Sequence, residues 1–188
     1  MKHVLNICLL AVAFCLLGAT AQAQDGKLEI NHLDRLTDRA TEAVEISLNE
    51  AQMRYLARLM MTDRRSETGL IGLFGKLSGV YVRGFEFDKP GEFSAADLNA
   101  LRAQLRGPGW QRLADVRERN GEQNEIYVLP GKDAIVGWAA ISTEPQKLCV
   151  INILGPLDLT ELSAVEKEFK LSKCGQGSSQ TRRLGGKK

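Results

Sequence analysis

Histidine is the scarcest reactive residue of this 188-residue chain, which contains only His3 and His32. If His3 is lost with an N-terminal leader, a Ser-His-Asp or Cys-His triad would have to be built on His32 alone. No nucleophile elbow or phosphate-cradling glycine loop accompanies it. We interpret His32 as a structural or exposed histidine, and the sequence predicts a protein that is not an enzyme.

Cysteine is almost as scarce, with Cys149 and Cys174 as the only thiols beyond the leader. Two thiols and one histidine do not supply the four ligands of a structural zinc site, so we expect no metal and no cofactor. The two cysteines are candidates for a disulfide in an oxidising compartment. The alternative is that Cys149 is a buried apolar residue and Cys174 lies in a tail.

The chain also lacks a large excess of charge of one sign, because it contains 25 Lys and Arg residues and 23 Asp and Glu residues. Proteins that bind polyanions through a basic surface are normally more unbalanced. We therefore expect no nucleic acid among the partners.

The chain has one N-terminal hydrophobic run, Val4 to Leu17, which is shorter than the roughly 20 residues that cross a bilayer. Lys2 precedes this run, and Ala21-Gln22-Ala23 has the small-x-small form of a cleavage site. We interpret residues 1–23 as a signal peptide cleaved near Ala23. The length disfavours an uncleaved membrane anchor, and the predicted location is periplasmic or secreted.

The remaining residues predict one domain, 24–172, followed by a disordered basic tail, 173–188. Apolar spacing and capping residues favour helices near Ile30–Arg39, Asn49–Met60, Gly69–Leu77, Ser94–Leu105 and Asp158–Phe169. Alternation and turn residues favour strands near Ala43–Leu48, Gly79–Phe87, Trp110–Glu118, Glu125–Leu129, Ala134–Ser142 and Leu148–Leu154. The segregated order predicts an α+β fold: a mainly antiparallel sheet with a C-terminal four-strand meander, and helices packed on one face.

Several residues are candidates for interactions. Tyr81, Arg83, Phe85 and Phe87 fall on one side of a predicted strand, where a guanidinium lies close enough to aromatic rings for cation-π contact. The alternative is a core edge with Arg83 reaching solvent. Trp138 is either a core residue or part of a partner surface.

The last predicted strand is apolar on both faces, so a second face needs cover. We expect an envelope protein or a second copy of the chain to bind there. Two alternatives stay open. Carboxylate pairs such as Glu86 with Asp88, or Glu122 with Glu125, would suit a hydrolase. The Gly69–Leu77 segment with the basic tail would suit peripheral membrane contact.

Three stretches, Tyr81–Asp88, Gly107–Trp110 and Asn152–Asp158, resemble an exported bacterial family known as domain of unknown function 4252. The similarity extends over about Leu28 to Leu171. The resemblance implies export and an envelope-stress or signalling context. It implies no catalytic residue, since the family has none assigned. The expected function is an exported, non-catalytic binding or regulatory module.

Overall fold

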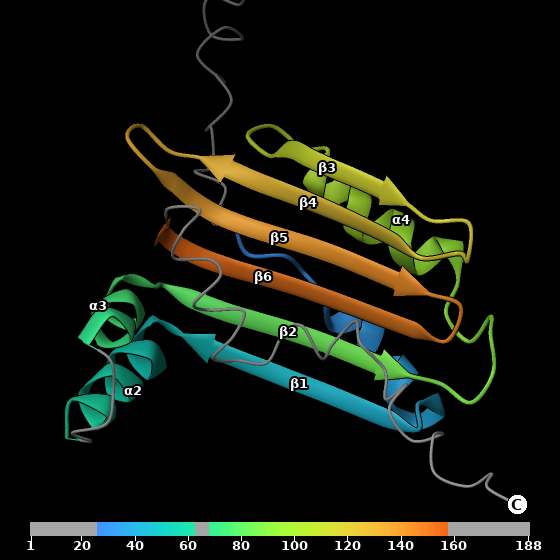
Figure 1. Ribbon diagram of the computed structural model, residues 1–188, viewed down its shortest axis with the longest axis horizontal. Helices are drawn as coiled ribbons and strands as arrows, with labels where there is room; N and C mark the ends of the chain where they lie inside the picture. Colours follow the sequence, from blue (N-terminus) through green and yellow to red (C-terminus); the bar gives the residue numbers. More distant parts are fainter. Residues whose placement is uncertain (1–25, 63–67, 158–188) are drawn as a thin grey trace, which may run out of the picture.

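The computed structural model describes residues 26–62 and 68–157, which are organised around a six-stranded sheet (Figure 1). The strands are β1 (Glu42–Asn49), β2 (Gly79–Glu86), β3 (Gln111–Arg117), β4 (Gln123–Pro130), β5 (Ile135–Glu144) and β6 (Lys147–Leu157). Their order is β1-β2-β6-β5-β4-β3, and every neighbouring pair is antiparallel. The α+β class is confirmed, and so is the C-terminal meander, which β3 to β6 form.

Two helical elements, the 3-10 helix η1 (Asn31–Arg39) and α4 (Ala95–Leu105), lie behind the sheet in Figure 1. We call the side that they cover the first face. Side chains of both pack there in one apolar cluster with alternate residues of β2, β4, β5 and β6. Since β2 lies near one edge of the sheet and β3 is the far edge, the connection that contains α4 crosses beneath the meander.

The other helices of the described ranges are α2 (Glu50–Thr62) and α3 (Thr68–Lys76), which lie where β1 ends and β2 begins. Met53 of α2 and Leu73 of α3 pack with Val80, Val82 and other residues of the opposite side of the sheet, the second face. The expectation that all helices lie on one face was therefore wrong for α2 and α3. The physical reason is that both faces carry apolar side chains, and each needs cover.

Capping residues set the starts of two helices. Before α4, the Ser94 N–H donates to Asp97 Oδ2 at 2.8 Å, and the Asp97 N–H donates to Ser94 Oγ at 3.4 Å. Before α2, the Asn49 N–H donates to Gln52 Oε1 at 2.8 Å, and the Gln52 N–H donates to Asn49 Oδ1 at 3.0 Å. Each box satisfies backbone donors that a helix start leaves free. Both helix starts are confirmed.

A fully buried asparagine ties the first described residues to the sheet. Asn152 Oδ1 accepts from the Leu28 N–H at 3.0 Å, and its Nδ2 donates to the Gly26 carbonyl at 3.2 Å. The same Nδ2 lies 3.3 Å from the Trp138 carbonyl. A buried amide needs such partners, and here two of them come from the chain that precedes η1.

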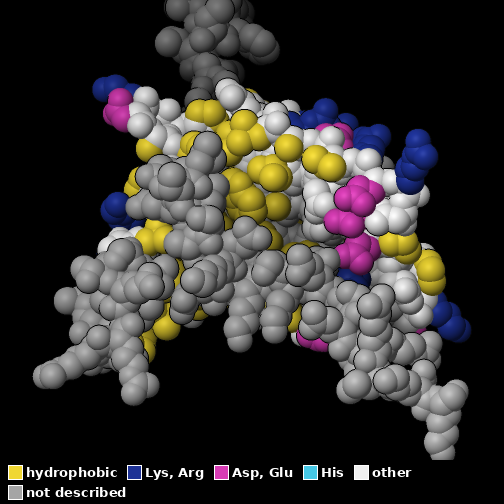
Figure 2. Space-filling view, viewed as in Figure 1, with side chains coloured by type: hydrophobic (Ala, Val, Ile, Leu, Met, Phe, Trp, Pro, Cys, Tyr) yellow, Lys and Arg dark blue, Asp and Glu magenta, His cyan; other side chains and the backbone are white. Residues whose placement is uncertain are grey.

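The predicted signal peptide (1–23), the final helix (158–169) and the basic tail (173–188) lie outside the described residues. Among the helices that are described, none has the length and apolar character that crossing a membrane requires. Figure 2 looks onto the second face, where apolar side chains gather over the sheet. Trp138 and Ala140 are half-buried in its cluster, and Val116 of the edge strand β3 is exposed.

Candidate functional site

Three of the residues predicted for interaction, Tyr81, Phe85 and Phe87, lie together on the first face, as the alternation of β2 indicated. All three are buried in the apolar cluster beneath η1. Lys27 lies over one of these rings, with its Nζ 4.8 Å from the centroid of Tyr81. These aromatic side chains form core, and an interaction role for them stays a prediction.

Arg83, the fourth of these residues, has a side chain that is only 8% exposed. Its Nε donates to Asp34 Oδ1 of η1 at 3.1 Å, and its Nη2 lies 2.8 Å from Glu45 Oε1 of β1. Glu45 is directly opposite Arg83 in the strand register. The guanidinium therefore neither reaches solvent nor stacks between rings; it fastens η1 and β1 to β2.

Cys149 is buried on the second face and is disulfide-bonded. All other cysteines of the chain lie outside the described residues, so its pairing with Cys174 stays a prediction. Trp138 lies on the same face, packed against the second cluster.

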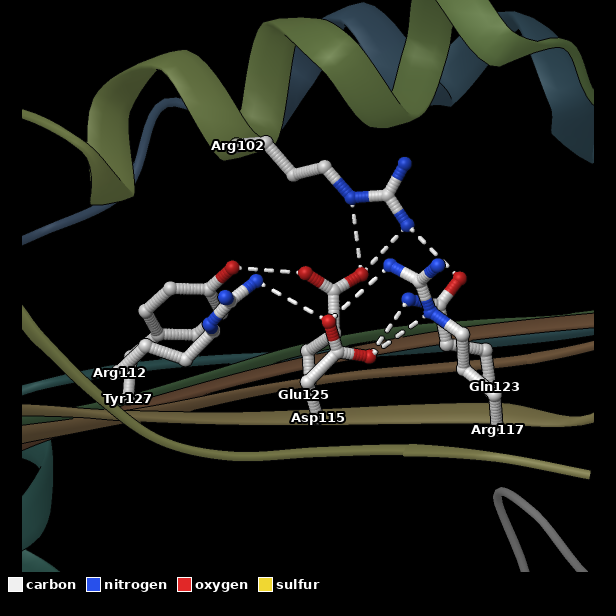
Figure 3. Close-up of polar contacts among 7 residues, drawn as sticks. All are labelled: Arg102, Arg112, Asp115, Arg117, Gln123, Glu125 and Tyr127. Atoms are coloured by element: carbon white, nitrogen blue, oxygen red, sulfur yellow. Dashed lines mark hydrogen bonds and ion pairs between the residues drawn. The ribbon is translucent and has the colours of Figure 1, made fainter.

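The site that the tertiary structure assembles is a cavity of about 520 Å³ between α4 and the strands β3 and β4. Ligand-binding cavities are commonly of this size. Four arginines line it: Arg102 of α4, Arg106 just after α4, and Arg112 and Arg117 of β3. Figure 3 shows three of them around two carboxylates of the sheet.

Glu125 of β4 is the buried carboxylate, with a side chain that is 2% exposed. Arg102 Nε donates to Glu125 Oε1 at 2.8 Å, and the Tyr127 hydroxyl donates to Oε2 at 2.7 Å. Burial raises the pKa of Tyr127 to about 12, and the hydrogen bond to Glu125 adds to that rise. Both oxygens of this carboxylate are thus engaged.

Asp115 of β3 is the second carboxylate. It accepts from Gln123 Nε2 at 2.9 Å, from Arg112 Nη1 at 3.0 Å and from Arg117 Nε at 3.1 Å. The hydrogen bond from Gln123, followed by that from Arg117, lowers the pKa of Asp115. This carboxylate is ionised at neutral pH and holds two arginines at the cavity.

A β-bulge brings these residues of β3 onto one side. The register with β4 passes from Arg112↔Tyr127 to Ala114↔Ile126, so Leu113 is an extra residue. Without the bulge, strict alternation would place Arg112 and Asp115 on opposite faces. This site was not predicted from the sequence, in which the recurrence of Arg112, Asp115 and Arg117 near the end of a strand was the only signal for it.

Glu86 and Glu122, candidates for carboxylate pairs with Asp88 and Glu125, both lie near a third glutamate. Glu122 and Glu86 both lie near Glu144 of β5, whose pKa is raised by burial and by these two charges against the opposing effect of Lys147. Lys147 Nζ lies 3.6 Å from Glu86 Oε2. This group is separate from the arginine-lined cavity, and among the described residues no cluster of His, Cys, Asp and Glu is placed to hold a metal ion.

His32, the histidine on which any triad would depend, lies in η1. Its Nε2 is 3.3 Å from the backbone carbonyl of Asp97. The Asp97 side chain is engaged with Ser94 and Arg35. This is a contact that joins η1 to the start of α4, and neither side chain lines the cavity.

The fold and the site together define an α+β protein in which one antiparallel sheet carries a basic cavity on its first face, between α4 and the strands β3 and β4. The chain belongs to the family described as Domain of unknown function (DUF4252), whose pattern matches residues 38–165. No curated protein matches the sequence. The resemblance found in the sequence is confirmed, and the matched range includes every strand of the sheet.

Proposed function

We propose that this protein is an exported, non-catalytic binding module, and that the cavity between α4 and β3–β4 is its binding site. One observation carries the proposal: four guanidinium groups surround a single cavity, while the two carboxylates beside them are already paired. Guanidinium groups bind ligands through N–H donors in a fixed geometry, and they stay protonated at neutral pH.

The state of the carboxylates favours binding over turnover at this cavity. A general acid needs a pKa near the working pH, whereas the pKa of Asp115 is lowered. Glu125 has both oxygens occupied by Arg102 and Tyr127. Asp115 is therefore poorly suited to act as a general acid, and both oxygens of Glu125 already have hydrogen-bond partners.

Export is supported by the N-terminal basic residue, apolar run and small-x-small site of the sequence, and cleavage there would keep the residues that Asn152 binds. Asn152 binds Gly26 and Leu28, only a few residues after the expected cleavage site near Ala23. To test export, cells that make the tagged full-length chain are fractionated. We expect a form processed near Gln24 in the extracytoplasmic fraction, and an intact precursor in the cytosol would contradict the proposal.

A carboxylate-based hydrolase is the second candidate, and the raised pKa of Glu144 favours it. The purified protein is assayed with chromogenic esters, glycosides and phosphate esters, alongside the Glu144→Gln variant. A binding module shows no turnover in either protein. Turnover that the variant lacks would establish the hydrolase instead.

The proposed regulatory role and the expected partner concern the second face. An envelope protein or a second copy would bury the apolar side chains around Trp138. Light scattering on the processed protein at micromolar concentration tests self-association. A monomer that binds no apolar dye would remove this part of the proposal. Peripheral membrane contact through α3 has less support, because Leu73, Phe74 and Leu77 are buried in the second cluster.

A further inference from the structure

The charges around the cavity do not balance. Arg102, Arg106, Arg112 and Arg117 line it, against the carboxylates of Glu125 and Asp115. Four positive and two negative groups leave an excess of two positive charges. Within the described part of the chain, the exposed side chain of Arg106 makes no hydrogen bond or ion pair.

The carboxylates orient the arginines without using all their donors. Arg102 bonds through Nε and Nη2, Arg117 through Nε and Nη2, and Arg112 through Nη1. Each guanidinium has five N–H donors, so every one of them keeps donors for a ligand. Side chains held in place before binding lose less freedom when a ligand arrives.

The cavity also has an apolar wall. Leu105, Trp110 and Tyr127 line it, and all three are largely buried. Aromatic and aliphatic walls with a few directed polar groups are typical of sites for small organic molecules. A ligand that matches both features carries acidic oxygens at one end and a flat or aliphatic body at the other.

We propose that the cavity binds an organic dianion, a phosphate monoester or a dicarboxylate with an apolar body. The inference rests on the proposed function and names the ligand class of the same site. The two extra positive charges match a doubly charged oxyanion, and guanidinium donors pair with phosphate and carboxylate oxygens in bidentate geometry. A cation is repelled by the same charges.

Trp110 lines the cavity, so its fluorescence can report on binding there. The chain contains only one other tryptophan, Trp138, and replacing Trp138 leaves Trp110 as the single tryptophan signal. In the Trp138→Phe background, phenyl phosphate, phthalate, benzoate and benzyl alcohol are titrated at low salt and at about pH 8, where a phosphate monoester is doubly charged. We expect phenyl phosphate or phthalate to change Trp110 fluorescence at concentrations about ten-fold lower than benzoate. Comparing the phenyl phosphate and phthalate titrations shows whether phosphate or carboxylate is preferred. Added salt should weaken the binding of both anions.

The matched variants are Arg106→Gln and Arg58→Gln, which remove the same charge inside and outside the cavity. Arg58 is an exposed residue of α2 and does not line the cavity. Loss of one charge-assisted contact predicts dianion binding about ten-fold weaker in Arg106→Gln and unchanged binding in Arg58→Gln. Since the Arg106 side chain has no described partner, its loss leaves the fold intact, which thermal unfolding checks.

Equal affinity for phenyl phosphate, phthalate and benzoate, undiminished binding in Arg106→Gln, or no Trp110 response to any of these anions would overturn the dianion proposal. Binding of benzyl alcohol alone would do so too, while leaving a binding module in place. The proposed function fails on other results, namely turnover that depends on Glu144 or a precursor in the cytosol.

Discussion

Among the described residues of the strands, Arg83 and Glu125 are buried charges on the first face, one in each half of the sheet, and their surroundings have opposite signs. Arg83 of β2 is paired with Asp34 and Glu45, whose side chains are 55% and 64% exposed. Glu125 of β4 is paired with Arg102, whose side chain is 20% exposed. The buried arginine thus has acidic partners that face solvent, and the buried glutamate has a basic partner on its solvent side.

The two halves also differ in how completely they are filled. Over Arg83, η1 packs against the sheet and supplies Asp34 directly. Over Glu125, long arginine side chains reach from α4 and β3 and line a cavity. Short carboxylates close one end of the face, whereas extended guanidinium groups hold the other end open, which is why the candidate site lies beside Glu125.

The largest expected effect comes from removing the buried carboxylate. Glu125→Ala leaves the guanidinium of Arg102 and the hydroxyl of Tyr127 without their acceptor, which costs about 3 kcal/mol of unfolding free energy. Urea unfolding measures this as a lower midpoint at an unchanged slope. A loss below about 1 kcal/mol would show that Glu125 does not organise the site.

Arg83→Met is the matching change in the other half, and it should cost less, about 1 kcal/mol. Asp34 and Glu45 are more than half exposed, so water solvates them when the arginine is lost. The methionine also keeps part of the buried stem in place. Urea unfolding compares both variants, and equal losses would mean that the exposure of the partners does not matter.

The phenol of Tyr127 reports on the buried negative charge. Because its pKa is raised to about 12, the stability that this group contributes is present below its ordinary pKa of about 10 and is lost as the pH rises through about 12. Ultraviolet titration of tyrosinate should show one delayed step. That step should be absent in Tyr127→Phe, and a protein whose tyrosines all titrate near the ordinary value would contradict this prediction.

The smallest effect is expected at acid pH. The lowered pKa of Asp115 means that its contribution is present above the ordinary aspartate pKa of about 3.9 and is lost as the pH falls through the lower folded value. Asp115→Asn should flatten the acid limb of a plot of stability against pH. An acid limb identical to that of the unchanged protein would show that Arg112 and Arg117 do not depend on this carboxylate.

The sequence by itself determined the local features. Alternation placed Tyr81, Arg83 and Phe85 on one side of β2, with Phe87 directly after the strand, and capping residues marked the starts of α2 and α4. Turn residues marked the meander. These features depend on neighbours within a few positions, where backbone geometry leaves few choices.

Only the tertiary structure decided the partners of the charged side chains. Arg83 pairs with Asp34 and Glu45, and Arg102 pairs with Glu125. The partners are too far apart in the sequence for a local pattern to predict the pairing. The bulge at Leu113 placed Arg112 on the same side of β3 as Asp115 and Arg117, although a strict two-residue period predicts opposite faces for Arg112 and Asp115. Helix cover on the second face likewise followed from the sheet order, because β6 between β2 and β5 carries apolar residues on both sides.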